Sequence, residues 1–254
     1  MTGSLKGKHA LVTGGGTGIG LAIARSLASA GVDVTITGRR ADVLQEAANA
    51  QERLHPLVMD VNNETSVVEG IQAAITARGP ITICVANAGI AEGKALHKSS
   101  LDDWRKILTT NLDGTFLTIR ECLEGMRQTG WGRVISISSI AGVKGLKGAP
   151  AYSASKHGVI GLIRALAADY AGTEITFNAI CPGYVDTDII TRNTESIAAR
   201  AGIDKDAARN MMVKTNAHKR LIAPEEIAAS AMWLCNPGSE SVNGQAIQIA
   251  GGEI

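Results

Sequence analysis

Short apolar runs rich in β-branched residues alternate along the chain with longer segments whose apolar residues recur at helical spacing. The short runs predict strands at 9–13, 34–37, 55–59, 81–87, 133–138, 174–180 and 245–250. The longer segments predict helices at 18–31, 41–52, 63–78, 100–126, 151–172 and 224–235. Strands that are separated by helices pair in parallel through right-handed crossovers. The pattern therefore predicts an α/β fold, a doubly wound sheet of about seven parallel strands with helices on both faces.

One long polar segment, 184–220, stands between the last two helix–strand units. It shows only weak helical patterning, at 196–200 and 205–212. Long excursions in compact domains are often lids or binding elements, so we expect this segment to close over a substrate; the alternative is a structural appendage. The 254 residues contain no Pro/Gly/Ser linker and no repeat, so we expect a single domain over 1–254.

The charge balance excludes two classes of partner. Twenty-five basic residues face 24 acidic ones, so no basic field exists to attract a nucleic acid or a membrane surface. No apolar run approaches the roughly 18 residues of a membrane span. Four widely spaced cysteines form no CxxC pair, which predicts neither a metal site nor a redox couple. We expect buried, reduced thiols and a soluble, cytoplasmic protein.

Glycine is abundant, with 29 residues, whereas aromatic residues make up only 3% of the chain. Several glycines gather in the run TGGGTGIG at 13–20, between the first strand and the first helix. Free amides and the helix dipole at such a turn bind a pyrophosphate, and glycines let it approach the backbone. The run predicts a dinucleotide site, with a purely structural tight turn as the alternative. The candidate residues are Gly14, Gly16, Thr17, Gly18, Ile19 and Gly20.

The end of the second predicted strand favours NADP(H) over NAD(H). Folds that choose NAD carry an acid there, about 20 residues after the glycine turn, for the ribose 2′-hydroxyl. This chain has Arg39 and Arg40 at that place, and Asp33 comes too early, at the start of the strand. A guanidinium fork suits a 2′-phosphate, and Arg40 can assist Arg39. The alternatives are NAD(H) as the cofactor and two solvated arginines that open a helix.

Tyr152 and Lys156 lie four residues apart on a predicted helix, so they share one face. A nearby ammonium lowers the pKa of a phenol, which lets a tyrosine exchange a proton with an alcohol or carbonyl oxygen. Taken alone, such a pair usually belongs to a plain helix surface. Ser138 and Ser139 end the preceding strand, at the sheet edge where ligands of a doubly wound sheet bind.

Two asparagines are further candidates for this site. Asn87, followed by Gly89, ends another strand, and Asn111 lies inside the long predicted helix, where asparagine is unfavourable. Each has a structural alternative: serine and asparagine at strand ends form turns, and a lone helical asparagine is usually exposed.

This combination resembles the short-chain dehydrogenase/reductase family over essentially the whole chain. The likeness rests on TGGGTGIG at 13–20, ANAG at 86–89, Asn111, ISS at 137–139, YSASK at 152–156 and CPGYVDT at 181–187. The resemblance implies a Rossmann fold and a catalytic tetrad of Asn111, Ser139, Tyr152 and Lys156. Ser139 is preferred to Ser138 because the family places its serine 13 residues before the tyrosine.

The resemblance also implies a role for each member of the tetrad. Tyr152 would protonate the substrate carbonyl oxygen during reduction and take the proton back during oxidation. Lys156 would bind the nicotinamide ribose and lower the pKa of the tyrosine. Ser139 would hydrogen-bond the carbonyl oxygen, and Asn111 would support a water relay to solvent.

Further cofactor contacts follow from the same likeness. Thr17 stands where some NADP-dependent members carry a basic residue, so the 2′-phosphate contact would rest on Arg39. Asp60 and Val61 would contact the adenine, Asn87 the adjoining ribose region, and Val185 with Thr187 the carboxamide. Gly89, Pro182 and Gly183 would also contact the cofactor. Tyr184 would contact the substrate, together with Met211 or Met212, for which core packing is an equal alternative.

Within the family, the nearest likeness is to 3-oxoacyl-carrier-protein reductases and polyketide ketoreductases. We therefore expect an NADP(H)-dependent oxidoreductase that interconverts a ketone and a secondary alcohol, assembled as a homotetramer. An NAD-linked hydroxy-acid or alcohol dehydrogenase is the alternative, although Ala91, Ala141 and Ala149 stand where a small hydroxy acid would need polar groups. A third hypothesis is a nucleotide-sensing protein without turnover. The intact pair of Tyr152 and Lys156 argues against it, because a sensor needs no acid–base group.

Overall fold

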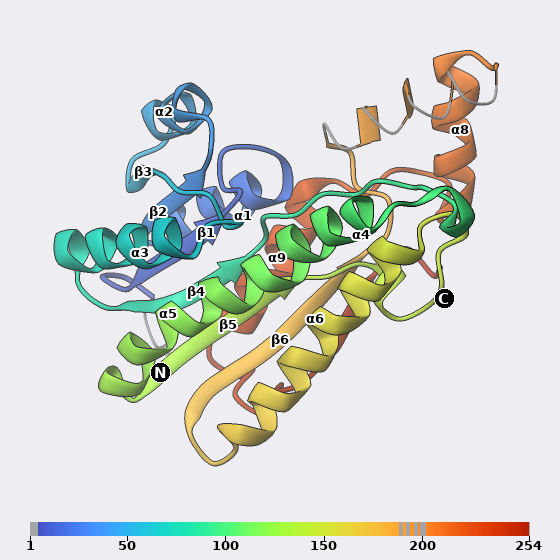
Figure 1. Cartoon of the computed structure of the whole chain (residues 1–254). Helices are drawn as coiled ribbons and strands as arrows, with labels where there is room; N and C mark the ends of the chain where they lie inside the picture. The colour runs from blue at the N-terminus through green and yellow to red at the C-terminus, as the bar shows by residue number, and fades with distance from the viewer. Residues whose placement is uncertain (1–4, 188–189, 192–193, 196–197, 199–201, 254) are drawn as a thin grey trace.

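Seven parallel strands form one sheet in the order β3-β2-β1-β4-β5-β6-β7 (Figure 1), within the residues that the computed structural model describes: 5–187, 190–191, 194–195, 198 and 202–253. The order runs outward from β1 and β4 in both directions, as in a doubly wound sheet. The strands are β1 His9–Thr13, β2 Asp33–Gly38, β3 Leu54–Val58, β4 Ile81–Ala86, β5 Trp131–Ile137, β6 Glu174–Pro182 and β7 Ala246–Ile249. The predicted fold class and the seven predicted strands are confirmed.

Helices cover both faces of the sheet (Figure 1). They are α1 Gly18–Ser29, α2 Ala41–Asn49, α3 Glu64–Arg78, α4 Leu101–Leu108, α5 Gly114–Thr129, α6 Pro150–Asp169, α8 Lys205–Thr215 and α9 Pro224–Cys235. Each face has its own core, and β1 contributes to both: Val12 packs with α1 and α9, whereas Leu11 packs with α3, α5 and α6. Alternate side chains of a strand point to opposite faces, so a strand buried on both sides is apolar throughout.

The predicted helix 100–126 is wrong in one respect, because it is not a single α-helix. A π-helical turn at Thr109–Asp113 separates α4 from α5. Asn111 lies in this turn and is fully buried, and its side chain hydrogen-bonds the backbone of Ile90 at the end of β4. This tertiary contact favours the wider turn at Asn111, and π turns of this kind are frequent at functional sites.

Within the described residues, the segment after β6 includes a short bridge and the helix α8. Val185 forms a parallel bridge with Ile222, and α8 follows with Asp204 as its N-cap, whose carboxylate accepts from the Ala207 amide at 2.6 Å. The predicted helix at 205–212 is thus confirmed. The predicted patterning at 196–200 falls mostly outside the described residues, and so do the side chains of Met211 and Met212.

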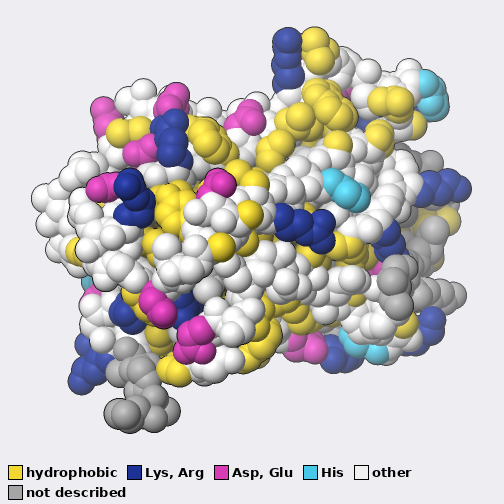
Figure 2. Space-filling view, turned by 90° about the horizontal axis from the view of Figure 1, so that it is seen from below, with side chains coloured by type: hydrophobic (Ala, Val, Ile, Leu, Met, Phe, Trp, Pro, Cys, Tyr) yellow, Lys and Arg dark blue, Asp and Glu magenta, His cyan; other side chains and the backbone are white. Residues whose placement is uncertain are grey.

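The surface and the interior agree with the composition. Figure 2 shows basic and acidic side chains interspersed on one face of the molecule, as the balanced charge predicts. All four cysteines are buried and unpaired, as expected. Among the helices described, none combines the length and apolarity needed to cross a bilayer. No group of three or more potential metal ligands occurs within the described ranges.

Candidate active site

The glycine turn leaves the start of α1 open to an anion. Thr17 is the N-cap residue, but its side chain makes no capping hydrogen bond, and the first turn of α1 holds no acidic residue. The unpaired amides and the positive end of the helix dipole favour a phosphate at this place. Gly18 has a φ of +53°, a left-handed conformation that glycine adopts without strain.

Asn87 fixes this turn to the end of β4. Its Nδ2 donates to the carbonyl oxygens of Thr13 at 2.8 Å and Gly14 at 3.3 Å. Thr13 Oγ1 in turn accepts from the amides of Asn87 and Ala88, both at 3.0 Å. A Cβ at Gly20 would lie 2.4 Å from the Gly14 oxygen, so only glycine permits this packing. The amide of Asn87 thus holds the turn in shape.

A cavity of about 360 Å³ lies beside the turn, at the ends of β2 and β3. Arg39 and Arg40 line it, both are exposed, and neither forms an ion pair with the residues that the structure describes. Asp33, in contrast, lies at the opposite end of β2 and pairs with Arg53 at 3.3 Å. The predicted cofactor residues that line this cavity are Gly14, Gly16, Thr17, Arg39, Arg40, Asp60, Val61 and Gly89.

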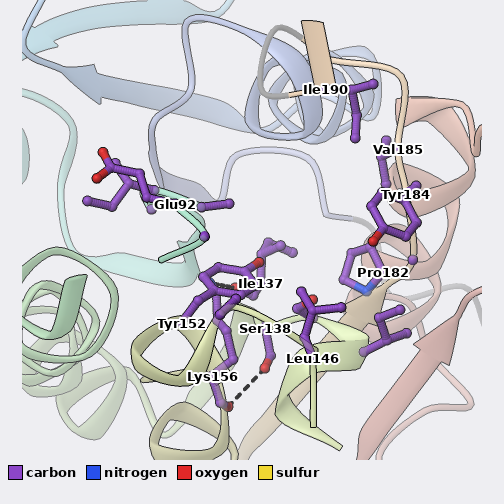
Figure 3. Close-up of a pocket in the computed structure, with 18 of the residues that line it drawn as sticks. Glu92, Ile137, Ser138, Leu146, Tyr152, Lys156, Pro182, Tyr184, Val185 and Ile190 are labelled. Atoms are coloured by element: carbon purple, nitrogen blue, oxygen red, sulfur yellow. Dashed lines mark hydrogen bonds between the residues drawn. The ribbon is translucent and has the colours of Figure 1, made fainter. Parts of the chain in front are cut away.

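A larger cavity of about 730 Å³ adjoins the first one, because Gly89 and Ile90 line both. In Figure 3, Tyr152 lies on one wall of this cavity and Tyr184 on the opposite wall, with both hydroxyl groups directed toward the space between them. The predicted residues that line it are Ile19, Asn87, Gly89, Ser139, Tyr152, Lys156, Pro182, Gly183, Tyr184, Val185 and Thr187. The two cavities form a continuous crevice at the carboxyl ends of the strands.

Three predicted site residues line neither cavity. Gly18 packs against Thr187, and Gly20 packs against the turn itself. Asn111 lies behind Gly89, where a Cβ would be 3.1 Å from Asn111 Oδ1 and 3.5 Å from Lys156 Nζ. These residues shape the crevice from behind its wall.

Asn111 links the two halves of the site through hydrogen bonds. Its Oδ1 accepts from the Ile90 amide at 2.8 Å, and its Nδ2 donates to the Ile90 carbonyl at 3.0 Å and to Ser155 Oγ at 3.1 Å. Ser155 Oγ then donates to the Tyr152 carbonyl at 2.8 Å. The side chain of Asn111 therefore joins the end of β4 to the first turn of α6, which carries Tyr152.

Burial dominates the titration of the central pair. It raises the pKa of Tyr152 above its ordinary value, and the neighbouring Ser139 hydroxyl only partly opposes this shift. Burial also lowers the pKa of Lys156 to about 8. Lys156 Nζ donates to the Ile137 carbonyl at 2.8 Å and lies 5.8 Å from the centre of the Tyr152 ring. Lys156 is not among the groups that shift the pKa of Tyr152 in this structure, so the expectation that Lys156 lowers it stays a prediction.

The two serines at the end of β5 do different things. Ser138 is buried, and its Oγ donates to the Lys156 carbonyl at 3.1 Å, which ties β5 to α6 (Figure 3). Ser139 lies beside the phenol of Tyr152, and its Oγ accepts from the Ala141 amide at 3.1 Å. The hydroxyl that acts on Tyr152 is thus that of Ser139.

Several residues of the site carry no signal in the sequence. Glu92, Leu146 and Lys147 line the larger cavity, and Ile190 completes its wall (Figure 3). Their positions depend on where the loops after β4 and β5 turn, which spacing does not reveal. Only their place after predicted strand ends could have marked them.

Comparisons with known proteins agree with this geometry. The sequence model of the short chain dehydrogenase family matches residues 8–198. The chain is 35% identical to 3-oxoacyl-(acyl-carrier-protein) reductase FabG of Aquifex aeolicus, over 98% of both chains. It is 32% identical to D-beta-hydroxybutyrate dehydrogenase of Cupriavidus necator, over 98% of this chain and 99% of that protein. A crystal structure of actinorhodin polyketide ketoreductase with NADPH superposes with a TM-score of 0.94 at 31% identity, covering 99% of this chain and 98% of that one.

Proposed function

Because this chain belongs to the short-chain dehydrogenase family, we propose that it is an NADPH-dependent reductase of 3-oxoacyl-type ketones. The family and the named relatives make it an oxidoreductase that interconverts ketones and alcohols with NAD(P). The observation that carries the finer proposal is the convergence of Tyr152, Ser139 and Lys156 on a cavity that adjoins the glycine turn.

The smaller cavity fits the adenosine half of a dinucleotide. The open start of α1 suits its pyrophosphate, and Asp60 with Val61 lines the place where adenine would lie. Arg39 and Arg40 offer guanidinium groups that no described acid neutralises, which favours the 2′-phosphate of NADP(H) over the 2′-hydroxyl of NAD(H). When bound, NADPH supplies the hydride for the reduction.

The reduction also needs a proton, and Tyr152 supplies it. Its raised pKa keeps the phenol protonated at neutral pH, which suits a general acid that donates to a carbonyl oxygen. Ser139 hydrogen-bonds the same carbonyl oxygen and orients it. Lys156 would hold the nicotinamide ribose. Asn111 joins the end of β4 to α6, where it would support a water relay that reprotonates Tyr152.

The larger cavity admits an extended ketone. We propose that the segment 184–220 covers it, with Tyr184 in contact with the substrate. Ala91 and Ala149 contribute only methyl groups to its wall, which disfavours a small hydroxy acid that needs several polar contacts to its carboxylate.

We further propose that the enzyme is a homotetramer. Phe116 on α5 is 45% exposed and Trp233 on α9 is 47% exposed, so two helices carry large apolar side chains that a neighbouring subunit can cover. Sizing chromatography with light scattering measures the assembly directly.

The function is tested by removing the hydroxyl of Tyr152. In Tyr152→Phe, we expect NADPH-dependent reduction of a 3-oxoacyl thioester to fall by about 10³-fold, while NADPH binding measured by fluorescence changes less than about threefold. Tyr170→Phe is the matched control, because the Tyr170 ring packs against Phe177 at 5.3 Å, away from the crevice. Retained turnover in Tyr152→Phe would remove that residue from its role. NADPH binding by the parent protein without turnover of any ketone would favour a sensor.

A further inference from the structure

Tyr184 places a second phenol in the larger cavity, opposite Tyr152 (Figure 3). Its hydroxyl makes no hydrogen bond to any residue in the described part of the chain, and burial raises its pKa, with the charge of Glu253 adding to the effect. A half-buried hydroxyl that faces a cavity and lacks a partner is a hydrogen-bonding group held ready for a ligand.

The backbone of Tyr184 is held by the side chain of Asn216 and by the Ile222 amide, which donates to the Tyr184 carbonyl at 2.9 Å. Asn216 is fully buried, and its Oδ1 accepts from the Tyr184 amide at 3.1 Å while its Nδ2 donates to the Tyr184 carbonyl at 3.1 Å. The same Nδ2 donates to the Arg220 carbonyl at 2.7 Å. Asn216 therefore adds two hydrogen bonds to the bridge between Val185 and Ile222, and together these contacts hold the backbone at Tyr184.

The carboxylate of Glu253 acts on Tyr184 through its charge, which raises the pKa of the phenol. The side chain of Glu253 is only 9% exposed, and its Oε1 accepts from Lys144 Nζ at 2.9 Å. Its other oxygen, Oε2, is buried without a hydrogen-bond partner among the residues described. Leaving a carboxylate oxygen buried and unpaired is unfavourable for stability, which points to a function for the charge.

We propose that Tyr184 is a hydrogen-bond donor for a second oxygen of the substrate, and that Asn216 and Glu253 are its positioning residues. The substrate class is then a ketone with a second carbonyl group, as in a 3-oxoacyl compound. This inference rests on the proposed function. The two phenols have different roles: Tyr152 exchanges a proton with the ketone, whereas Tyr184 donates a hydrogen bond and keeps its proton.

The test compares two ketones of similar length. Ethyl acetoacetate carries a second carbonyl, and 2-heptanone does not. We expect Tyr184→Phe to lower the ratio of their kcat/KM values, ethyl acetoacetate over 2-heptanone, by about tenfold, because one hydrogen bond to the substrate is lost. Tyr170→Phe, the matched control, leaves the ratio unchanged. An unchanged ratio in Tyr184→Phe overturns the proposal, because Tyr184 is then only a wall of the cavity.

A binding measurement separates this proposal from the proposed function. Isothermal titration of each ketone into Tyr152→Phe with bound NADPH reports the preference without turnover. We expect tighter binding of ethyl acetoacetate, and we expect Tyr184→Phe in the same background to remove that preference. Equal binding of both ketones overturns the role of Tyr184. Absence of turnover in the parent protein with a preserved binding preference refutes the reductase function alone.

The role of Glu253 has its own spectroscopic readout. The chain has three tyrosines, so the double variant Tyr152→Phe/Tyr170→Phe leaves Tyr184 as the one phenol that absorbs near 295 nm on ionisation. The titratable groups near Tyr184 are Glu253, which pairs with Lys144, and Tyr152 across the cavity. We expect Glu253→Gln to move the titration midpoint to lower pH, since the negative charge that opposes ionisation is gone.

The control for this change is Glu64→Gln, which removes a carboxylate from an exposed ion pair with Arg120 on α5. It leaves the midpoint where it was. A midpoint that does not move in Glu253→Gln shows that Glu253 does not act on Tyr184 and overturns its positioning role. A lowered ratio of kcat/KM values in Glu253→Gln, with the same melting temperature as the parent, separates positioning from a loss of folded structure.

Discussion

The two ends of the parallel sheet treat polar side chains in opposite ways. At the amino ends of β1 and β2, polar groups satisfy one another. His9 at the start of β1 hydrogen-bonds both the Gly79 carbonyl and Thr35 Oγ1, each at 2.8 Å. Asp33 at the start of β2 pairs with Arg53 and with His55, each at 3.3 Å. These contacts pair the polar groups at this end with one another.

At the carboxyl ends, similar groups lack partners in the described residues and face a crevice. Arg39 and Arg40 follow β2 without an acid, and the Tyr184 hydroxyl follows β6 without an acceptor. The strand β2 shows this contrast at its two ends. Asp33 at its start is paired with Arg53, whereas Arg39 and Arg40, which follow its end, have no acidic partner among the described residues. Polar groups that the protein does not pair internally mark the end of the sheet that binds ligands.

The largest expected effect at the carboxyl end comes from reversing the charge of Arg39. Arg39→Asp replaces a phosphate partner by a repelling carboxylate, so we expect the preference for NADPH over NADH, as a ratio of kcat/KM values, to fall by about 100-fold. Arg25→Asp is the control, because Arg25 lies on the exposed face of α1 and lines neither cavity. A ratio that stays the same in Arg39→Asp shows that the 2′-phosphate is bound elsewhere or that NAD(H) is the cofactor.

A smaller effect is expected from the ionisation of Lys156. Its pKa of about 8 means that the ammonium is present below pH 8 and is lost above it. Since kcat/KM for NADPH reports the free enzyme, we expect it to be nearly constant below about pH 7, to be halved at about pH 8 and to fall about tenfold per pH unit above about pH 9. The pKa of Tyr152 is raised, so its ionisation adds a further loss only at higher pH.

Two variants decide whether the ionisation of Lys156 causes the decline of kcat/KM at high pH. Lys156→Arg keeps a positive charge at every pH measured, so the decline above pH 8 disappears even if the absolute rate is lower. Lys156→Gln has no charge to lose and starts from a lower, flat value. If kcat/KM declines at the same pH in Lys156→Gln, another group causes the decline.

The contrast between the two ends also explains what the sequence could predict. Strand ends and the spacing of Tyr152 and Lys156 are local features, and a doubly wound fold places them at one edge, so the crevice and its principal residues could be located in advance. The exposed arginines after β2 could be found for the same reason.

The remaining features depend on contacts between distant segments. Asn111 sits in a π turn because its side chain reaches Ile90, and Glu253 approaches Tyr184 only after the chain returns through β7. The raised pKa of Tyr152 depends on its burial, which a four-residue spacing to Lys156 does not report. Hydrophobic periodicity carries no information about such contacts, so they could not be predicted.

The smallest expected effect belongs to the amino end. Asp33→Asn removes a charge from an ion pair whose side chains are 35% and 42% exposed, so water screens most of the interaction. We expect the free energy of unfolding to fall by about 0.2–1 kcal/mol, with kcat/KM for NADPH within about twofold of the parent value. Because screening by salt weakens exposed pairs, the stability difference should vanish near 1 M salt in denaturant titrations. A double-mutant cycle with Arg53→Ala isolates the pair. If Asp33→Asn instead changed the preference for NADPH over NADH, the amino end of β2 would contribute to cofactor choice, and the division between the two ends of the sheet would fail.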